Sequence, residues 1–341
     1  MIQLESKATD RFRRDVIVRL AAVQRQLSHR AYGFHSAERR GRLSTENRRA
    51  GSVSRGRRSQ AGSFGGEAPV QCRRRPTYNR AVPRRPPIVL AYHGIVAVNP
   101  AHDPVRLFVA PDSFRAQVRV LKKRGYRLVK MAEFAAETAG GGGTPPDGLA
   151  ALTFDDGTDD HANSLPGLLE ELDVPGTVYC CPGLLGAPYP WADPALGARF
   201  MTRPEFDRTA AHPLIEIGSH TINHTVLEQA NAATALQEMR DCRLALEAMT
   251  AAPVLSFCYP RCLYSEPCPA AAIEAGYTSA VTCGPRGSWA PGEMQRQCIH
   301  TPDGRLVFEL KLRGRYDRLR SVGPAPAVRA LTRPWRHRAE R

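Results

Sequence analysis

Two adjacent carboxylates follow directly on an apolar run of the sequence. The run 149–154 reads LAALTF, and Asp155 and Asp156 come next. Burying one unpaired carboxylate costs free energy, and burying two side by side costs more unless a cation lies close to them. The pair is therefore either an ordinary solvated turn or part of a site that binds a cation.

Two histidines follow a second apolar run. His220 and His224 come after LIEIGS (214–219), and on a helical turn this spacing would place both imidazoles on one face. Two histidines and one carboxylate are a common ligand set for a divalent metal, and they leave positions open for water and substrate. Either feature alone is usually a surface turn, but together they predict a metal site. One aspartate would bind the cation, and the other would accept a proton from water.

The segments that must position these residues alternate between strand and helix. Short apolar runs predict strands, and longer stretches with helical spacing predict helices between them. The predicted strands are 88–92, 126–129, 149–154, 176–181, 214–219, 254–259 and 279–283. One predicted helix is capped by Asp112 or Ser113 and ends at Gly125. The other predicted helices are 130–137, 162–172 and 233–249. This alternation indicates an α/β fold with mostly parallel strands, and the number of units fits a barrel over residues 88–315.

In such barrels the functional groups gather at the carboxyl ends of the strands. Polar or ionisable residues follow four of the predicted strands. His93 follows strand 88–92, and the aspartate pair follows strand 149–154. His220 follows strand 214–219, and Pro260 and Arg261 follow strand 254–259. We therefore expect these side chains to converge at one end of the barrel.

The net charge of +15 belongs to the two ends of the chain. Residues 1–87 carry a net charge of +15 and residues 311–341 of +8, whereas residues 88–310 carry −8. Basic arms of this kind can bind nucleic acid or anionic membranes non-specifically, but the Arg-, Ser- and Gly-rich composition is also typical of a solvated, disordered tail. We expect a disordered segment at 1–86, a globular domain at 87–315 and a basic tail at 316–341.

No apolar run reaches the length of about 18 residues that a membrane-spanning helix needs, and the first residues do not form a recognisable secretory signal. We therefore expect a cytoplasmic protein. The odd number of cysteines, nine, predicts reduced thiols. Cys258, Cys262 and Cys268 are close enough in sequence to suggest a second metal site, although they contain no C-x₂-C pair, and Cys180 and Cys181 fit a buried strand.

Several of these motifs resemble one known family. TFDDG (153–157) and SHTINH (219–224) resemble the first two motifs of the polysaccharide deacetylase family, also called the NodB-homology or carbohydrate esterase 4 family. FCYP (257–260) is similar to its third motif in the F-x-Y-P form. AGYTSAVT (275–282) resembles the segment that follows this motif. The LAYHGI start (90–95), the helix with the pattern F…L…GY and the closing segment GRLVFELKLRG (304–314) resemble the branch that acts on partly β-1,6-linked N-acetylglucosamine polymers and related envelope glycans. The resemblance covers residues 88–314.

This resemblance implies a fold, a cofactor and a reaction. The fold is a distorted (β/α) barrel, and the cofactor is one divalent metal, most often zinc, with cobalt or nickel as alternatives. The enzyme would be a linear-amide hydrolase that removes N-acetyl groups from an N-acetylglucosamine-containing polysaccharide or oligosaccharide, such as a chitooligosaccharide, poly-N-acetylglucosamine or an envelope glycan. The implied roles are metal ligation by Asp156, His220 and His224, general-base catalysis by Asp155, general-acid catalysis by His93 or His300, and substrate binding by Tyr259, Pro260 and Arg261.

The third motif departs from the pattern of the family. Many members have an arginine there that orients the catalytic aspartate, and this chain has Cys258 at that position. Arg261 and Cys262 stand where tyrosine and glycine are usual. Two other functions therefore remain open from the sequence: a catalytically weakened, sugar-binding relative, or a nucleic-acid or membrane-surface binder that acts through its basic ends.

Overall fold

The computed structural model of the chain describes residues 85–284, 288–301 and 303–316. The predicted disordered segment 1–86 and the predicted tail 316–341 lie outside these residues, apart from Arg85, Pro86 and Tyr316. The boundaries proposed for the three parts of the chain therefore stay predictions.

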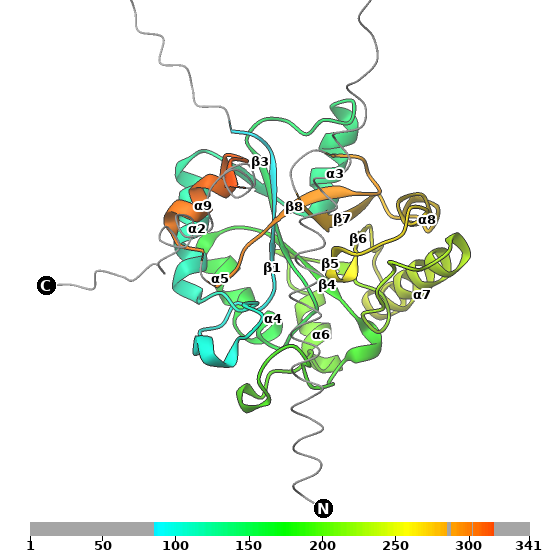
Figure 1. Ribbon diagram of the computed structural model, residues 1–341, viewed down its shortest axis with the longest axis horizontal. Coiled ribbons are helices and arrows are strands. Elements are labelled where there is room, and N and C mark those ends of the chain that lie inside the picture. The colour runs from blue at the N-terminus through cyan, green and yellow to red at the C-terminus, as the bar shows by residue number, and fades with distance from the viewer. Residues whose placement is uncertain (1–84, 285–287, 302, 317–341) are drawn as a thin grey trace, which may run out of the picture. The chain divides into compact units, whose positions relative to one another are not determined.

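Seven parallel strands form a closed ring, which confirms the predicted α/β barrel (Figure 1). β1 (Ile88–Tyr92) pairs with β3 (Leu149–Phe154) on one side and with β8 (Met294–Cys298) on the other. From β3 the ring continues through β4 (Gly176–Cys180), β5 (Ile215–Ser219), β6 (Ser256–Cys258) and β7 (Ser279–Cys283) to β8. The short β2 (Arg127–Val129) pairs with the first half of β3, whose second half pairs with β4.

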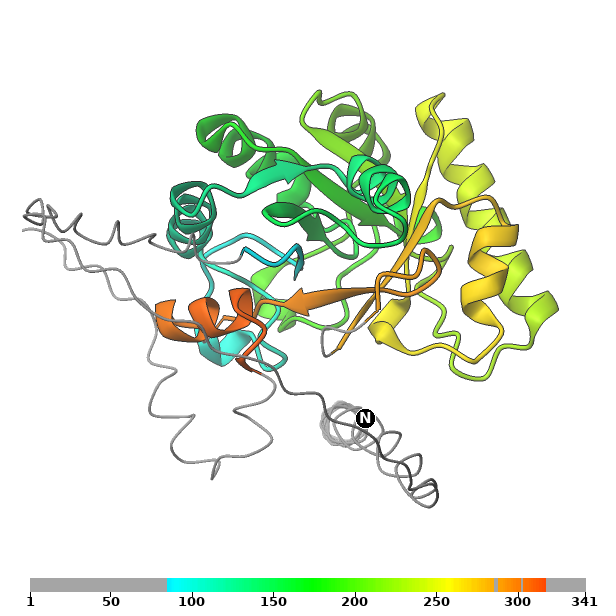
Figure 2. The same ribbon diagram turned by 90° about the horizontal axis from the view of Figure 1, so that it is seen from above.

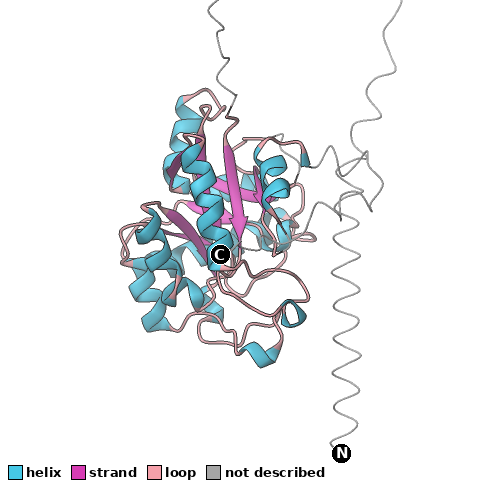
Figure 3. Cartoon of the chain, turned by 90° about the vertical axis from the view of Figure 1, so that its left-hand side faces the viewer, coloured by secondary structure: helices cyan, strands magenta, loops and turns pink. Residues whose placement is uncertain are grey.

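Helices lie on the outside of the ring (Figures 1, 2 and 3). They are α2 (Pro111–Lys123), α3 (Met131–Gly140), α4 (Asp160–Asn163), α5 (Leu165–Leu172), α6 (Arg203–Ala210), α7 (Ala232–Thr250), α8 (Cys268–Glu274) and α9 (Arg305–Leu312). α7 and α8 lie side by side on one flank, and α2, α5 and α9 lie on the opposite flank. Within the described part of the chain, none of the helices has the length and apolar character needed to cross a lipid bilayer.

Both faces of the strands are buried, and alternate residues contribute to two separate apolar clusters. On β3, Leu149 and Ala151 belong to a cluster that also contains Tyr179, Val281 and Met294. The intervening residues of β3 pack in the larger cluster formed with the surrounding helices, whose members include Ala150, Leu152, Phe154, Phe114, Val118 and Leu121. Gly218 on β5 makes room for Tyr179, because a Cβ at that position would lie 2.5 Å from the tyrosine ring.

Three features of the local structure differ from what the sequence led us to expect. The predicted helix 162–172 is interrupted at Ser164, because Pro166 lacks the N–H that a continuous helix would need. The strand β8 was not predicted, since its residues, MQRQC, form no apolar run. His220 and His224 do not share a helical turn. They follow β5 in an irregular segment, in which Thr221 and His224 have left-handed φ angles of 61° and 57°.

Candidate active site

The ring brings several predicted site residues to its carboxyl end. Tyr92 is paired with Phe154, so His93 and Asp155 are the next residues on neighbouring strands, and the Asp155 N–H donates to the Tyr92 carbonyl at 2.9 Å. His220 follows β5 in the same way, with its N–H 3.0 Å from the Cys180 carbonyl. The convergence predicted from the strand ends is therefore present in the structure.

Asp156, His220 and His224 form a compact group of candidate ligands. The Nε2 atoms of His220 and His224 lie 3.3 Å and 3.5 Å from Asp156 Oδ1. All three ligand atoms lie within 4.8 Å of one another. Asp156 has a left-handed φ of 76°, so the chain turns sharply between the two aspartates. This turn allows two adjacent carboxylates to face different partners.

The protonation of this group fits a bound cation. His220 Nδ1 lies 2.7 Å from the carbonyl oxygen of Cys258. A carbonyl can only accept a hydrogen bond, so Nδ1 carries a proton, and Nε2 is the nitrogen that faces Asp156 and can ligate a cation once it is unprotonated. Asp156 Oδ1 has no hydrogen-bond partner among the described residues, although it is buried. A carboxylate oxygen and two imidazole nitrogens that face one another without a donor are a suitable set for a divalent metal.

The electrostatic balance supports the same interpretation. Burial alone would raise the pKa of Asp156, but the neighbouring imidazoles, above all that of His220, outweigh burial and lower the pKa. Burial lowers the pKa of His224 to about 3, despite the opposing effect of Asp156, so this imidazole is neutral and able to ligate. Burial also disfavours charge on His220, but the two aspartates raise its pKa overall. Either a proton on His220 or a bound metal ion can therefore offset the negative charge of the same two carboxylates.

Asp155 is held by an arginine that was not predicted from the sequence. Arg296 on β8 is fully buried and donates to Asp155 Oδ1 at 2.6 Å and to Oδ2 at 2.8 Å. It also donates to Thr153 Oγ1 and to Cys258 Sγ, both at 3.0 Å. Burial favours the neutral acid, but Arg296 reverses this effect and lowers the pKa of Asp155. Arg296 therefore makes, from a different strand, the contact that the arginine missing from the third motif would have made.

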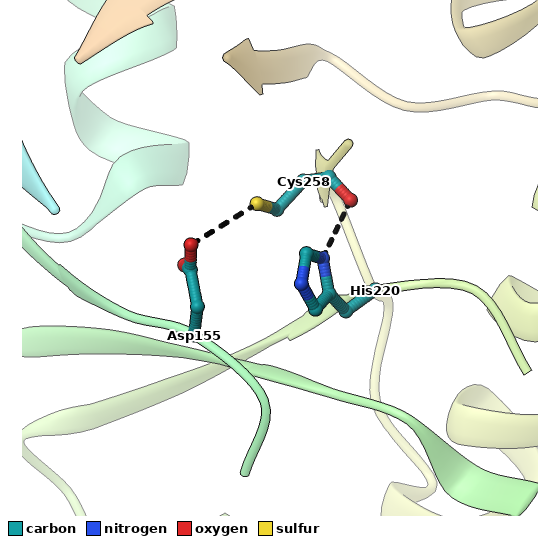
Figure 4. A group of neighbouring side chains, drawn as sticks. All are labelled: Asp155, His220 and Cys258. Carbon is teal, nitrogen blue, oxygen red and sulfur yellow. Dashed lines mark hydrogen bonds between the residues drawn. The ribbon is translucent and has the colours of Figure 1, made fainter. Parts of the chain in front are cut away.

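A second group of candidate ligands consists of Asp155, His220 and Cys258 (Figure 4). Cys258 Sγ lies 3.6 Å from Asp155 Oδ2, and burial raises the pKa of this thiol well above its usual range. A cation in this group would also lie against the guanidinium of Arg296, which already contacts both Asp155 and Cys258. Like charges at this distance repel strongly inside a protein, so the group with Asp156 and His224 is the better metal site.

Tyr189 and Trp191 complete the surroundings of the candidate ligands. The Tyr189 hydroxyl donates to Asp156 Oδ2 at 2.5 Å, and the Trp191 ring lies 4.3 Å from that of His224. Both come from the long connection between β4 and α6. Neither residue was predicted from the sequence, in which the pair of aromatic residues in the segment APYPWADP is the one available signal.

The two predicted general-acid histidines differ in their neighbours. His93 acts electrostatically on both Asp155 and Asp156, and its buried Nδ1 has no hydrogen-bond partner among the described residues. Burial lowers the pKa of His300 to about 4, and its chief charged neighbours are Lys311 and Asp303, followed by His93. The geometry favours His93, while the catalytic roles of both residues stay predictions.

The predicted substrate-binding residues separate into buried and exposed ones. Tyr259 is fully buried, donates its hydroxyl to the Gly292 carbonyl at 2.7 Å and stacks on Tyr264. Its side chain therefore belongs to the core and has no surface for a glycan, and Pro260 is also buried. Arg261 is exposed with a left-handed φ of 56°, and its charge lowers the pKa of His224, although less than burial does. Of the three, only Arg261 faces the solvent at the open end of the ring.

The barrel and the grouped side chains define a domain of the polysaccharide deacetylase type. The family described as Polysaccharide deacetylase matches residues 142–280. The resemblance to this family, predicted from the aspartate and histidine motifs, is therefore confirmed over these residues.

The individual relatives are distant. The Bacillus subtilis (strain 168) protein YxkH, whose name describes it as a candidate polysaccharide deacetylase, is 26% identical over 198 residues. The match covers 58% of this chain and 64% of YxkH, so the chain spans less than two thirds of that relative.

Among solved structures, the Streptococcus pyogenes deacetylase PplD in complex with acetate has a TM-score of 0.54 at 23% identity, over 71% of this chain and 99% of PplD. IcaB from Ammonifex degensii has a TM-score of 0.56 at 17% identity, over 68% of this chain and 97% of IcaB. At these identities the similarities establish the fold of the domain.

Proposed function

We propose that this chain is a metal-dependent hydrolase that removes N-acetyl groups from an N-acetylglucosamine-containing glycan. The observation that carries the proposal is the arrangement of the two adjacent aspartates. Asp156 faces two histidines, and Asp155 is fixed by a buried arginine beside them. The set of two histidines and one carboxylate suits zinc best, with cobalt and nickel as alternatives.

Asp155 is the general base of the proposed reaction. The two hydrogen bonds from Arg296 keep its carboxylate ionised and fix the direction of its oxygens. A base held in this way can accept a proton from a water molecule as that water attacks the amide carbonyl. Asp156, His220 and His224 would hold the metal, which when bound polarises the carbonyl and makes the water more acidic.

The remaining groups act on the departing amine and on the developing charge. His93, which neighbours both aspartates, would protonate the sugar nitrogen as the amide bond breaks, and His300 is the alternative donor. The backbone N–H at Arg261, at the open end of the ring, would stabilise the developing oxyanion. The products are acetate and a glucosamine unit with a free amine.

Acetate release tests this proposal directly. The chain is first stripped of metal and then assayed on β-1,4- and β-1,6-linked N-acetylglucosamine oligomers, with and without zinc or cobalt. We expect acetate release that depends on the added metal and is abolished by a chelator. If the oligomers bind but no acetate is released under any metal condition, the chain is a sugar-binding relative and the hydrolase proposal is wrong.

A further inference from the structure

Two buried polar residues lie just beyond the aspartate pair in the sequence and have no role in the proposed reaction. They are Asp160 and His161, the first two residues of the short helix α4. Asp160 is buried, and His161 is fully buried, so neither side chain belongs to an ordinary solvated turn. Buried polar groups are almost always hydrogen-bonded, and their partners show which part of the structure they hold in place.

Both side chains bind the backbone of the turn that follows β1. His161 Nε2 lies 2.9 Å from the carbonyl oxygen of His93, and because a carbonyl can only accept, the imidazole donates from Nε2. Asp160 Oδ2 accepts from the N–H of Ile95 at 2.6 Å, while its Oδ1 accepts from the Thr158 hydroxyl at 2.7 Å. The first two residues of α4 therefore hold this turn at its first and third residues.

The middle residue of the turn, Gly94, is fixed as well. Its carbonyl accepts from the N–H of Val109 at 2.9 Å. A Cβ at this position would lie 2.4 Å from the ring of Phe108 and 3.4 Å from Asp160 Oδ1, so a side chain larger than that of glycine has no room. All three residues of the turn 93–95 thus have backbone groups bound by other segments of the chain, which leaves the turn little freedom to move.

The side chain that this turn carries into the site is that of His93. β1 and β3 are in register at Tyr92 and Phe154, so His93 and Asp155 are neighbours at the carboxyl end of the ring. Because side chains alternate along a strand, both lie on the same side of the sheet. The buried Nδ1 of His93 has no hydrogen-bond partner among the described residues. The backbone turn, and not a hydrogen bond at this nitrogen, therefore sets where the imidazole lies.

We propose that Asp160 and His161 are positioning residues for the deacetylation: they fix the turn that carries His93 and so hold its imidazole where it can protonate the departing amine. This inference rests on the proposed function, in which His93 is the favoured proton donor. Both residues act through His93 and not on the substrate itself. A displacement of about 1 Å at a reacting group can cost about 10²-fold in rate, so the turn need not unfold for the effect to be large.

The leaving group of the substrate distinguishes a misplaced proton donor from general damage to the site. An amine must be protonated as it departs, whereas p-nitrophenolate departs without a proton, and both reactions need the same base and metal. The zinc-loaded full chain and its variants are assayed on N-acetylglucosamine oligomers and on p-nitrophenyl acetate. His161→Phe keeps a ring against Phe154 but loses the donor. It should lower acetate release from the oligomers about 10²-fold and change ester hydrolysis little.

Asp160→Asn should give the same difference between the two substrates, because its amide NH₂ would face one of the two donors that the carboxylate now accepts from. His161→Gln is the conservative variant, since its side-chain N–H can replace the Nε2 donor, and it should recover most of the lost rate. Asp159→Asn is the matched control. It changes an adjacent aspartate whose own N–H is bonded to the Arg199 carbonyl, and it should behave like the native chain.

Zinc content and the thermal midpoint are measured for every variant, and if His161→Phe does not fold, Asp160→Asn carries the test. Equal losses on the two substrates in a folded, zinc-loaded variant would overturn the inference, because they would indicate damage to the whole site. So would unchanged rates in both variants, or a His161→Gln protein that is no faster than His161→Phe. A native chain that hydrolyses the ester but releases no acetate from any oligomer would instead overturn the proposed function, and this inference with it.

Discussion

The open end of the barrel has two halves, which differ in how closely their residues match the family motifs. On the β3 and β5 side, Asp155, Asp156, His220 and His224 match the family motifs residue by residue. On the β6, β7 and β8 side, the motif arginine is absent, and cysteines occupy the ends of all three strands. Yet the contact that the arginine would make is still present, because Arg296 reaches Asp155 from β8.

The difference shows which features of the site depend on position and which depend on charge. A metal needs ligand atoms at closely defined distances, so the residues around Asp156 leave little freedom. Orientation of Asp155 needs only a guanidinium whose donors meet both oxygens, and a long arginine side chain can supply it from another strand of the same ring. A missing motif residue therefore does not by itself indicate a missing function.

The largest effect should come from Asp155→Asn. The amide keeps the shape of the carboxylate but cannot accept a proton, so acetate release should fall by about 10²–10⁴-fold if general-base catalysis makes its usual contribution. Bound metal should be unchanged, because Asp155 is held by Arg296 and is not one of the three proposed ligands. Acetate release near the native rate would remove Asp155 from the mechanism.

Arg296→Gln should be the next most damaging change. It leaves the Asp155 carboxylate buried without its counter-charge, and breaking one side of a buried ion pair costs about 3–5 kcal/mol. We expect a lower unfolding midpoint in urea and an Asp155 pKa that rises, so that residual activity shifts towards higher pH. An unshifted pH profile in a folded Arg296→Gln protein would show that this arginine does not tune Asp155.

The double variant Cys258→Arg, Arg296→Cys sharpens the comparison between the two halves. It returns the guanidinium to the position that is usual in the third motif. If the two positions are interchangeable, this variant should be more active and more stable than Arg296→Gln. Equal or lower activity would mean that β8 holds the arginine in a way that β6 cannot reproduce.

Tyr189→Phe should have a smaller effect, on the β3 and β5 side. It removes the hydroxyl that donates to Asp156 Oδ2 but keeps the ring that packs near Phe200. Loss of a hydrogen bond to a metal ligand typically weakens metal affinity by about 10–100-fold. Competition for zinc with a chromophoric chelator measures this change, and Tyr126→Phe, which alters a hydroxyl at Pro86, serves as the control.

Glu205→Gln should have the smallest effect, on stability alone. Glu205 accepts hydrogen bonds from Arg199 and from the Thr202 N–H, where the β4–α6 connection enters α6. Loss of the Glu205 carboxylate should lower the free energy of unfolding by about 1–2 kcal/mol, as for other residues that cap a helix.

The ion pair between Glu205 and Arg199 also predicts that the stability of the folded chain depends on pH. Arg199, followed by other donors, holds the pKa of Glu205 below its usual range in the folded chain. The stabilisation is therefore present above the unfolded pKa of about 4.3 and is lost as the pH falls below it. The difference in thermal midpoint between the native chain and Glu205→Gln should shrink from pH 7 to acidic pH. A constant difference would contradict this assignment.

The parts of the fold and of the site that depend on a local pattern of residues could be predicted from the sequence. The β3 and β5 strands are short, apolar and followed by charged residues, so both the strands and their polar ends could be identified. α2 was predicted because Phe114, Val118 and Leu121 share one face, and all three are buried.

The features that were missed depend on closure of the ring. β8 contains two glutamines and an arginine, and its burial is explained only by pairing with β7 and β1 on both sides. Arg296 and Tyr189 meet their partners across long sequence separations. The left-handed turns at Asp156 and His224 were likewise invisible, because neither residue is a glycine.

The central claim is that the two adjacent aspartates have different partners, a metal for Asp156 and Arg296 for Asp155. The most direct test is the zinc content of the dialysed native chain, of Asp155→Asn and of Asp156→Asn. We predict that Asp155→Asn keeps its zinc and that Asp156→Asn loses it, since an amide oxygen is a poorer ligand than a carboxylate. Loss of zinc from Asp155→Asn and retention by Asp156→Asn would reverse the two roles, and unchanged zinc in both would contradict the claim.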